Sequence, residues 1–395
     1  MSQKLSSLEL NGRINKLLVK LKEGNRDFDT AIIAGRVNQY YFTGAMADGL
    51  FILKSDGRRF FFVRRSPKRA SLESPLGIIY PIASYRDITS VLGVGLGVTY
   101  LETDLIPLSM LERLKKYFNF SEIHPIEPQV NALRGVKSNY ELGLIRRAGR
   151  LHKKLLEDIV PGLLAEGMSE AEFHGELFSE MMKLGYQGVS RFAMFQTEMV
   201  LGQVGFGANS IYPTSFDGPG GMRGQSAASP AAGNRARRLK KGDLVFVDIG
   251  FGYEGYHTDK TQVYSFGREV DERVKQIHSA CIETQKRAAE LLTPGNTPAE
   301  IYKTVMAKLP SALKKGFMGY ESSVKFLGHG VGLQIDEPPA IAAGFNDRIA
   351  EKMVIALEPK CAIGKVGTVG VEETYIVREF GGECVTGGGR DIIVV

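Results

Sequence analysis

The sequence has 395 residues, of which 43% are hydrophobic and 24% charged, with a formal net charge of +6. This length allows two domains with sizeable cores. Lys and Arg are spread along the chain, so the small positive excess does not indicate nucleic-acid binding. No stretch approaches the ~18 apolar residues of a membrane span, and the N-terminal segment lacks the apolar core of a signal peptide. The three scattered cysteines, Cys281, Cys361 and Cys384, favour a reducing compartment. Taken together, these features lead us to expect a cytoplasmic protein that binds neither nucleic acid nor membrane.

Residues 1–133 have the pattern of an α/β domain without a chemical centre. A helical segment, Leu8 to Leu21, comes first, and the Asp56-Gly57 pair is typical of a hairpin turn. A second amphipathic helix is predicted over 108–118. Apolar and β-branched runs predict strands at 30–33, 37–44, 49–53, 59–63 and 97–101.

Residues 134–395 form the second predicted domain, which begins with two helices and later repeats that arrangement. Ser138 with Glu141, Ser169 with Glu172, and Thr297 with Glu300 are capping-box signatures of helix starts. Helices are predicted to run from 138 to about 160, from 169 to about 184, over 271–292 and from 297 onward. Strand-rich sequence follows each helix pair, which favours an α+β fold made of two duplicated halves. Two unrelated helical hairpins would give the same pattern.

Between the two halves lies a long segment, 202–234, rich in Gly, Ala, Ser and Pro. Long loops in compact domains are usually functional or disordered, and this one leads directly into the strands discussed next. We therefore expect it to form a wall of a substrate pocket. The basic cluster at 235–241 that follows is typical of a solvated face, although an anion site would have the same composition.

Two aspartates lie in strand-like sequence within residues 242–266. Asp248 interrupts the apolar run 244–249, and an ionised carboxylate is costly to bury without compensating charge. A hairpin centred between Tyr253 and Glu254 would place Asp248 directly opposite Asp259, with Cβ atoms ~5 Å apart. Carboxylates that close repel one another unless a cation lies between them.

Three further candidates follow downstream. His329 lies in the glycine-rich stretch 328–333, where a structural histidine and a ligand are equally compatible with the sequence. Pairing of strands about a turn at 364–367 would place Glu358 opposite Glu372. Strand alternation alone does not choose between Glu372 and Glu373, but this register favours Glu372.

Two aspartates, one histidine and two glutamates on buried elements suit Mn²⁺, Co²⁺ or Zn²⁺. Bridging carboxylates would hold two such ions ~3.5–4 Å apart. The competing interpretation is that the five groups are separate salt-bridge partners, which would require five independent buried coincidences.

Almost the whole chain resembles the pita-bread metallopeptidases, a family that includes Xaa-Pro aminopeptidase, prolidase, methionine aminopeptidase and creatinase. The resemblance is carried by VNQYYFTG and LRGVKSNYEL, and by four metal-ligand motifs: VDIGFGYEGYHTDKT, GHGVGL, ALEP and VGVEET. It implies a creatinase-like N-terminal α/β domain (1–133), a pseudo-two-fold catalytic domain (134–395) and a homodimer.

The resemblance also implies roles for individual residues. It makes Asp248, Asp259, His329, Glu358 and Glu372 ligands of two divalent ions, with Asp259 and Glu372 bridging them. A metal-bridging hydroxide would then attack the scissile carbonyl of a small peptide, with Glu358 as proton shuttle. We further expect Asp336 to act at the catalytic centre. Tyr212, Thr214 and His257 are expected to line the substrate pocket.

Three departures from the family pattern bear on the substrate. Thr214 replaces a histidine that usually follows proline in the pocket loop, Asp336 replaces the second usual histidine, and Gln262 stands where an arginine often occurs. An ionised aspartate cannot donate a hydrogen bond, so Asp336 would instead face a cationic group or an amine. The leading hypothesis is a two-metal Xaa-Pro aminopeptidase or dipeptidase.

Two other hypotheses are retained. The same scaffold could act on a non-peptide small metabolite, by hydrolysis or by lyase chemistry. A non-catalytic binding module is the third, which the complete ligand set argues against. Creatinase activity is less favoured, because that branch of the family does not keep the full set of metal ligands.

Overall fold

The computed structural model describes all residues except 1–4, 25–26, 195–196, 198 and 217. The chain divides into two compact units, Met1–Arg134 and Gly135–Val395.

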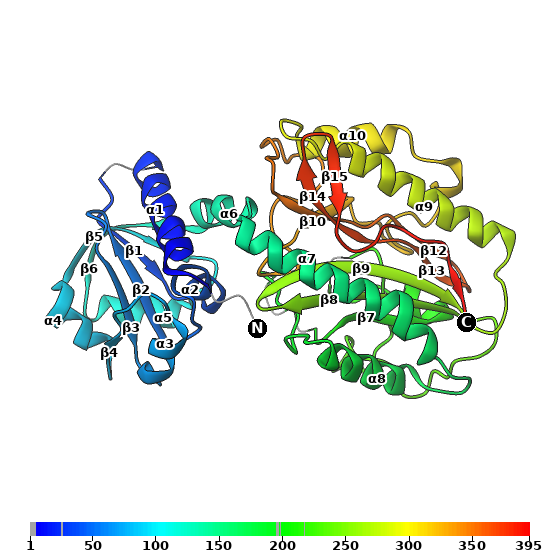
Figure 1. Cartoon of the computed structure of the whole chain (residues 1–395), viewed down its shortest axis with the longest axis horizontal. Coiled ribbons are helices and arrows are strands. Elements are labelled where there is room, and N and C mark those ends of the chain that lie inside the picture. Colours follow the sequence, from blue (N-terminus) through cyan, green and yellow to red (C-terminus); the bar gives the residue numbers. More distant parts are fainter. Residues whose placement is uncertain (1–4, 25–26, 195–196, 198, 217) are drawn as a thin grey trace. The chain divides into compact units, whose positions relative to one another are not determined.

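The first unit is built on a six-stranded mixed sheet with strand order β4-β3-β2-β1-β5-β6 (Figure 1). As predicted, the Asp56-Gly57 turn joins β2 and β3, which pair antiparallel. The strands are β1 (Thr30–Ile33), β2 (Gly49–Lys54), β3 (Arg59–Val63), β4 (Tyr80–Pro81), β5 (Gly95–Leu101) and β6 (Asn119–Pro125). The helices are α1 (Ser7–Gly24), α2 (Arg36–Thr43), α3 (Pro67–Glu73), α4 (Thr89–Leu92), α5 (Leu108–Lys115) and α6 (Glu127–Gly135).

The predicted strand at 37–44 is wrong, because these residues form helix α2. The buried carboxylate of Glu102 accepts the backbone N–H groups of Ala34 and Gly35 at 2.5 and 2.6 Å, at the N-terminal end of the helix. Gly44 ends it in the left-handed conformation, with φ 77°. Caps at both ends and tertiary burial thus outweigh the strand preference of the tyrosines and phenylalanine.

The helices of the second unit begin where the capping-box signatures predicted. Ser138, Ser169 and Thr297 each accept a backbone N–H from the glutamate three residues later, whose carboxylate bonds back to the cap residue. The helices are α7 (Asn139–Lys154), α8 (Glu170–Lys183), α9 (Glu272–Glu290) and α10 (Pro298–Ala307). A π-turn (Leu155–Ile159) and a short 3₁₀ turn (Val160–Gly162) extend α7 to its predicted Pro-Gly stop.

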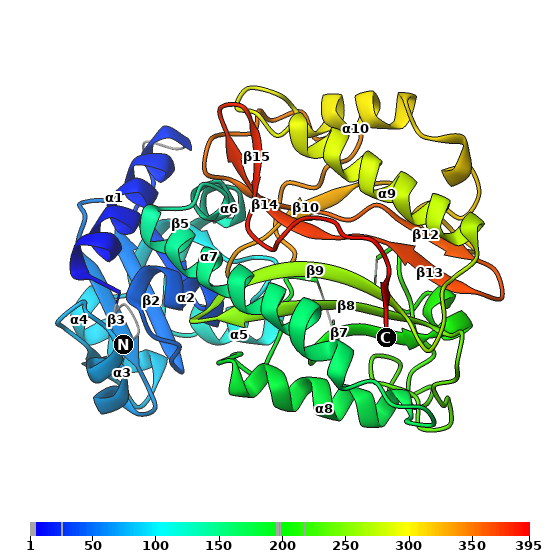
Figure 2. The ribbon, with the colours of Figure 1, turned by 45° about the vertical axis from the view of Figure 1, so that its right-hand side comes forward.

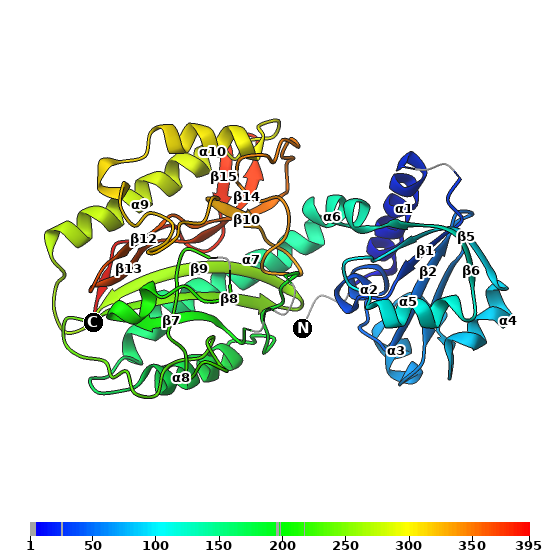
Figure 3. The ribbon, with the colours of Figure 1, turned by 180° about the vertical axis from the view of Figure 1, so that it is seen from behind.

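Three groups of strands lie between these helices. One sheet has the order β16-β9-β8-β7, a second has β10-β11-β14-β15, and β12 pairs with β13. Seen from behind, β7, β8 and β9 lie side by side, with β10 and the β12–β13 ribbon above them (Figure 3). The strands are β7 (Gly202–Phe206), β8 (Leu244–Tyr253), β9 (Tyr256–Ser265), β10 (Gly328–Gly330), β11 (Val354–Leu357), β12 (Lys360–Ile363), β13 (Gly367–Gly370), β14 (Glu373–Arg378), β15 (Gly381–Cys384) and β16 (Ile393–Val394).

Strand β7 corrects the prediction of a loop over all of 202–234. Its five residues are buried and pair antiparallel with β8. A Cβ at Gly202 would lie 2.2 Å from the carbonyl oxygen of Asp248, so this glycine permits close sheet packing. The glycines in this part of the segment therefore lie in a strand rather than in a loop.

The two halves of the second unit each have a hydrophobic core. Helices α7 and α8 pack with β7, β8 and β9 in a core that includes Ala148, Phe173 and Val247. Helices α9 and α10 pack with the C-terminal strands in a core that includes Ile277 and Ile355. Helix α9 runs along the outer side of the β12–β13 ribbon (Figure 2). The predicted pseudo-two-fold arrangement of two α-then-β halves is confirmed.

Two glycines of α7 provide a matched pair for testing packing of this helix. A Cβ at Gly149 would lie 2.2 Å from the carbonyl oxygen of Val385, whereas a Cβ at Gly143 would meet nothing within 4 Å. Gly149→Ala is expected to lower the free energy of unfolding by about 1–3 kcal/mol through overpacking. Gly143→Ala should raise it by about 0.5–1 kcal/mol because alanine favours the helix. Urea unfolding of both variants measures the difference, and equal effects would contradict the close contact between Gly149 and Val385.

His152, also on α7, predicts a loss of stability in acid. It is fully buried, its Nδ1 lies 3.1 Å from Thr258 Oγ1, and burial lowers its pKa to about 3. In the unfolded chain the imidazole is protonated below its ordinary pKa of 6.5, whereas in the folded chain it stays neutral down to about pH 3. The stability that the neutral, buried His152 contributes is therefore complete above pH 6.5 and falls as the pH decreases. At about pH 5 the expected loss is about 2 kcal/mol. Urea unfolding at neutral pH and at about pH 5 should show a smaller acid loss for His152→Gln than for the native chain. Equal losses would exclude this role.

Candidate metal centre

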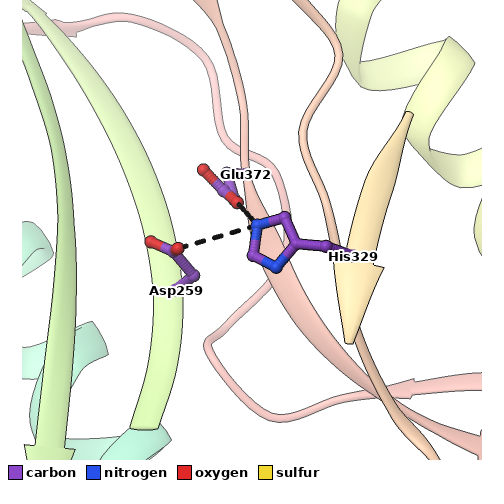
Figure 4. Close-up of side chains that lie close together, drawn as sticks. All are labelled: Asp259, His329 and Glu372. Carbon is purple, nitrogen blue, oxygen red and sulfur yellow. Dashed lines mark ion pairs between the residues drawn. The ribbon is translucent and has the colours of Figure 1, made fainter. Parts of the chain in front are cut away.

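Three potential ligands converge from separate segments of the chain. Asp259 lies on β9, His329 on β10, and Glu372 immediately before β14. His329 Nε2 is 3.9 Å from Asp259 Oδ2 and 3.6 Å from Glu372 Oε1 (Figure 4). One ligand atom of each residue lies within 4.8 Å of the other two.

The donor set of this triad suits a divalent cation. Glu372 Oε1 is buried and has no hydrogen-bond partner within the part of the chain that the structure describes. A buried carboxylate oxygen without a donor is costly unless a cation binds it. Two carboxylates and one imidazole are ligands that Zn²⁺, Mn²⁺ and Co²⁺ accept. The Asp259–His329–Glu372 triad therefore fits one ion.

Asp248 and Glu358 complete the predicted set of five but contact a lysine that the sequence analysis did not select. Lys360 is 0% exposed, and its Nζ lies 2.8 Å from Asp248 Oδ2 and 2.8 Å from Glu358 Oε2. The same nitrogen lies 2.6 Å from Glu372 Oε2. Glu358 also reaches the triad, because its Oε1 is 3.5 Å from His329 Nε2. The signal was present in the sequence: Lys360 follows Glu358 by two residues, the spacing of side chains on one face of a strand.

The first hairpin has a register different from the one predicted. Asp248 pairs with Thr261, and Asp259 pairs with Gly250, so the two aspartates are not directly opposite. The turn is formed by Glu254 and Gly255, both with positive φ, and this moves the pairing by two residues. A shift of two keeps both carboxylates on the same face, and Thr261 Oγ1 donates to Asp248 Oδ1 at 2.9 Å.

The second hairpin has the predicted register. Leu357 pairs with Glu373 on one side and Lys360 with Gly370 on the other, so Glu358 and Glu372 lie opposite each other between these ladders. Glu373 faces away from the triad and bonds to buried Lys260. The structure thus brings Glu372, rather than Glu373, to His329.

The protonation of the buried acids shows how unevenly the site is charged. Burial raises the pKa of Glu358 to about 8 and that of Asp248 to about 7, in each case against the attraction of Lys360. Burial and the charge of Glu372 raise the pKa of Asp259 well above its ordinary value. For Lys360, burial lowers the pKa, but the surrounding carboxylates outweigh it and hold the ammonium charged. These raised pKa values mean that the acids resist ionisation together, and a bound cation would favour their ionised forms.

The residues predicted to line the substrate pocket occupy different environments. Thr214 lines an open pocket of about 600 Å³, together with Phe216 and residues 228–232. Tyr212 is partly exposed, and the Arg223 guanidinium lies 4.9 Å from its ring centre.

His257 is fully buried, so it does not line an open pocket surface. Its Nδ1 lies 3.1 Å from the Gly332 carbonyl oxygen, and its Nε2 lies 2.8 Å from Gln187 Nε2. Burial lowers its pKa to about 4, so the ring is neutral near neutral pH. His257 therefore ties the segment around Gln187 to the glycine-rich turn that carries His329.

Asp336 lies on the other side of the His329 ring. Its Oδ1 is 3.8 Å from Nδ1 of His329, and its side chain is 34% exposed. This exposure makes Asp336 the most open acid beside the triad, which is compatible with the predicted contact to a substrate amine.

Comparisons with known proteins agree with this geometry. Residues 143–379 match the model of Metallopeptidase family M24, and residues 13–136 match the Creatinase/Prolidase N-terminal domain. The chain belongs to metallopeptidase family M24. It is a peptidase of a divalent-metal-dependent family, with the creatinase-like and pita-bread architecture predicted from the sequence.

Relatives of this M24 peptidase match it over nearly all of its length. It is 26% identical over 384 residues to an Xaa-Pro dipeptidase of Pyrococcus furiosus, covering 96% of this chain and 99% of the relative. The fold is similar to the prolidase structure from Pyrococcus horikoshii OT3, with a TM-score of 0.78, 24% identity, and coverage of 97% and 100% of the two chains. An X-Pro aminopeptidase structure from Thermotoga maritima gives a TM-score of 0.76, 24% identity, and coverage of 97% and 99%. Within the described part of this chain, no helix has the length and apolar character needed to span a bilayer.

Proposed function

We propose that the chain is a divalent-metal-dependent peptidase of the Xaa-Pro dipeptidase or aminopeptidase type. The observation that carries this proposal is the Asp259–His329–Glu372 triad, whose ligand atoms lie within 4.8 Å of one another. The Xaa-Pro dipeptidase of Pyrococcus furiosus, similar over nearly the full length, supports the substrate class. Mn²⁺, Co²⁺ or Zn²⁺ is the proposed ion.

The chain's own residues have distinct parts in this proposal. A divalent ion, when bound, polarises the scissile carbonyl and lowers the pKa of a water molecule. Asp259, His329 and Glu372 would hold the ion. Glu358 is proposed to take a proton from the attacking water and pass it to the leaving amine, and its distance of 3.5 Å from His329 Nε2 supports this role. Asp336 is proposed to hold a cationic substrate group from the more exposed side.

The two-ion centre predicted from the sequence needs Asp248 as a ligand. In the structure that carboxylate is shared between Lys360 and Thr261. The triad therefore supports one ion directly, while a second ion would have to displace the ammonium group.

The test is an assay of Xaa-Pro dipeptides and Xaa-Pro tripeptides with the chelator-treated protein, before and after addition of Mn²⁺, Co²⁺ or Zn²⁺. Turnover that chelation removes and metal restores is expected, with Xaa-Ala peptides as the control for proline preference. Absence of metal-dependent turnover across both peptide lengths would contradict the proposal.

A second candidate keeps the metal site but acts on a non-peptide metabolite. It is favoured by Thr214 and Asp336, which replace two histidines expected from the family resemblance. A turnover screen with cationic small molecules distinguishes this candidate, because Asp336 places an exposed carboxylate beside the triad.

We also propose a cytoplasmic homodimer. All three cysteines are free, as expected in a reducing compartment, and the dimer follows from the family resemblance. Light scattering coupled to size-exclusion chromatography would measure the oligomeric state.

A further inference from the structure

We propose that the ammonium group of Lys360 takes the place of a second metal ion, so that each chain binds one divalent cation at the Asp259–His329–Glu372 triad. This inference rests on the metal-dependent function proposed above. It concerns the number of ions and the identity of the second positive charge.

Lys360 uses all of its hydrogen-bonding capacity within the cluster. An ammonium group has three N–H donors and no acceptor. Its Nζ lies within 2.8 Å of one oxygen each from Asp248, Glu358 and Glu372. With three donors and three carboxylate acceptors, no N–H remains for substrate or water. Lys360 therefore acts as a fixed structural cation rather than as a catalytic residue.

Lys360 and a second ion would compete for the same space. A transition-metal ion binds carboxylate oxygens at ~2.0–2.2 Å. An ion sharing the three oxygens that surround Nζ would lie in the volume that the ammonium fills. The ion and the ammonium would also repel each other strongly in this buried site. Occupation by Lys360 and occupation by a second ion are thus mutually exclusive.

The two carboxylate oxygens of Glu372 have different surroundings. Oε2 bonds to Lys360 at 2.6 Å, whereas Oε1 points toward His329 and has no hydrogen-bond donor among the described residues. One oxygen is satisfied by the ammonium, and the other is left for a cation on the His329 side. Glu372 therefore links one built-in charge to one metal position.

The local fold accommodates the lysine. Lys360 is the first residue of β12, and it pairs with Gly370 of β13. A Cβ at Gly370 would lie 2.6 Å from the Cα and 3.2 Å from the Cβ of Lys360, so a side chain at this position would press on the lysine. The glycine, with φ 133°, leaves room for the buried lysine stem.

The test is the number of ions bound per chain. The full-length protein is stripped with chelator, equilibrated with Mn²⁺, and analysed by elemental analysis and by electron paramagnetic resonance. We expect one Mn²⁺ per native chain with the spectrum of an isolated ion. Lys360→Ala should bind two Mn²⁺ per chain and show an exchange-coupled spectrum, because three carboxylates lose their counter-charge.

Lys260→Ala is the matched control. Lys260 is equally buried and is paired with Glu373 and Glu157, on the face away from the triad. Its loss should leave the count at one. Lys360→Gly, which removes both the charge and the side-chain volume, provides a second variant if the alanine variant does not fold, and it too should bind two Mn²⁺.

The outcomes separate this inference from the function on which it rests. Two ions per native chain, or one ion in a folded Lys360→Ala variant, would overturn the role of Lys360 and leave a metallopeptidase. No ion in the native chain would overturn both proposals.

Discussion

Replacing His329 with alanine is expected to abolish both turnover and the stabilisation of the protein by divalent metal. His329 Nε2 lies within 3.9 Å of Asp259, Glu358 and Glu372, so its removal takes the nitrogen ligand away from the proposed metal site. We expect kcat/KM for an Xaa-Pro dipeptide to fall at least ~10²–10³-fold. The rise in Tm that saturating Mn²⁺ gives the native protein, expected to be several degrees, should disappear.

His174→Ala is the control for simply losing a partly buried histidine. His174 lies on α8, and burial lowers its pKa, but it is not part of the cluster. This variant should keep the Mn²⁺-induced rise in Tm and most of the turnover, even if it is less stable. A normal metal response in the His329→Ala variant would show that the ion binds elsewhere.

Features determined by a few neighbouring residues were predictable from the sequence. The three capping boxes predicted the starts of α7, α8 and α10, because a cap depends only on a side chain and the N–H groups within one turn. The second hairpin register followed from the turn at 364–367, and the structure places Glu358 opposite Glu372. The five residues named from the sequence all lie in or beside one buried cluster.

Features that depend on tertiary partners were not predictable in the same way. Helix α2 is capped by Glu102, more than sixty residues away, so its local strand preference was misleading. The first hairpin offers several glycines to the turn, and only the backbone conformations of Glu254 and Gly255 fix the register. Lys360 carries no motif of its own. Its spacing from Glu358 is a weak local signal, and its importance becomes clear only when the folded chain brings Asp248, Glu358 and Glu372 around it.

Glu358→Gln should separate proton transfer from metal binding. The amide keeps the size of the side chain and an oxygen that can accept from Lys360, but it cannot take up the proton of the attacking water. The Asp259–His329–Glu372 triad is unchanged, so the metal content should equal that of the native chain. We expect kcat to fall by about 10²–10⁴ while KM changes little. The pH profile of kcat/KM should also lose one limb, because the group that titrates on that side is gone.

Glu373→Gln is the matched control, because Glu373 is also a buried acid, directly after Glu372 in the sequence, but it faces Lys260 instead of His329. Its turnover and pH profile should remain close to native. If Glu358→Gln retained kcat within tenfold, the proton would have to travel by another group, and Asp336, 3.8 Å from His329 Nδ1, would be the next acid to examine. If Glu358→Gln instead lost its ion, Glu358 would be a ligand first. The split between metal content and kcat therefore decides which of the two roles predicted for Glu358 it performs.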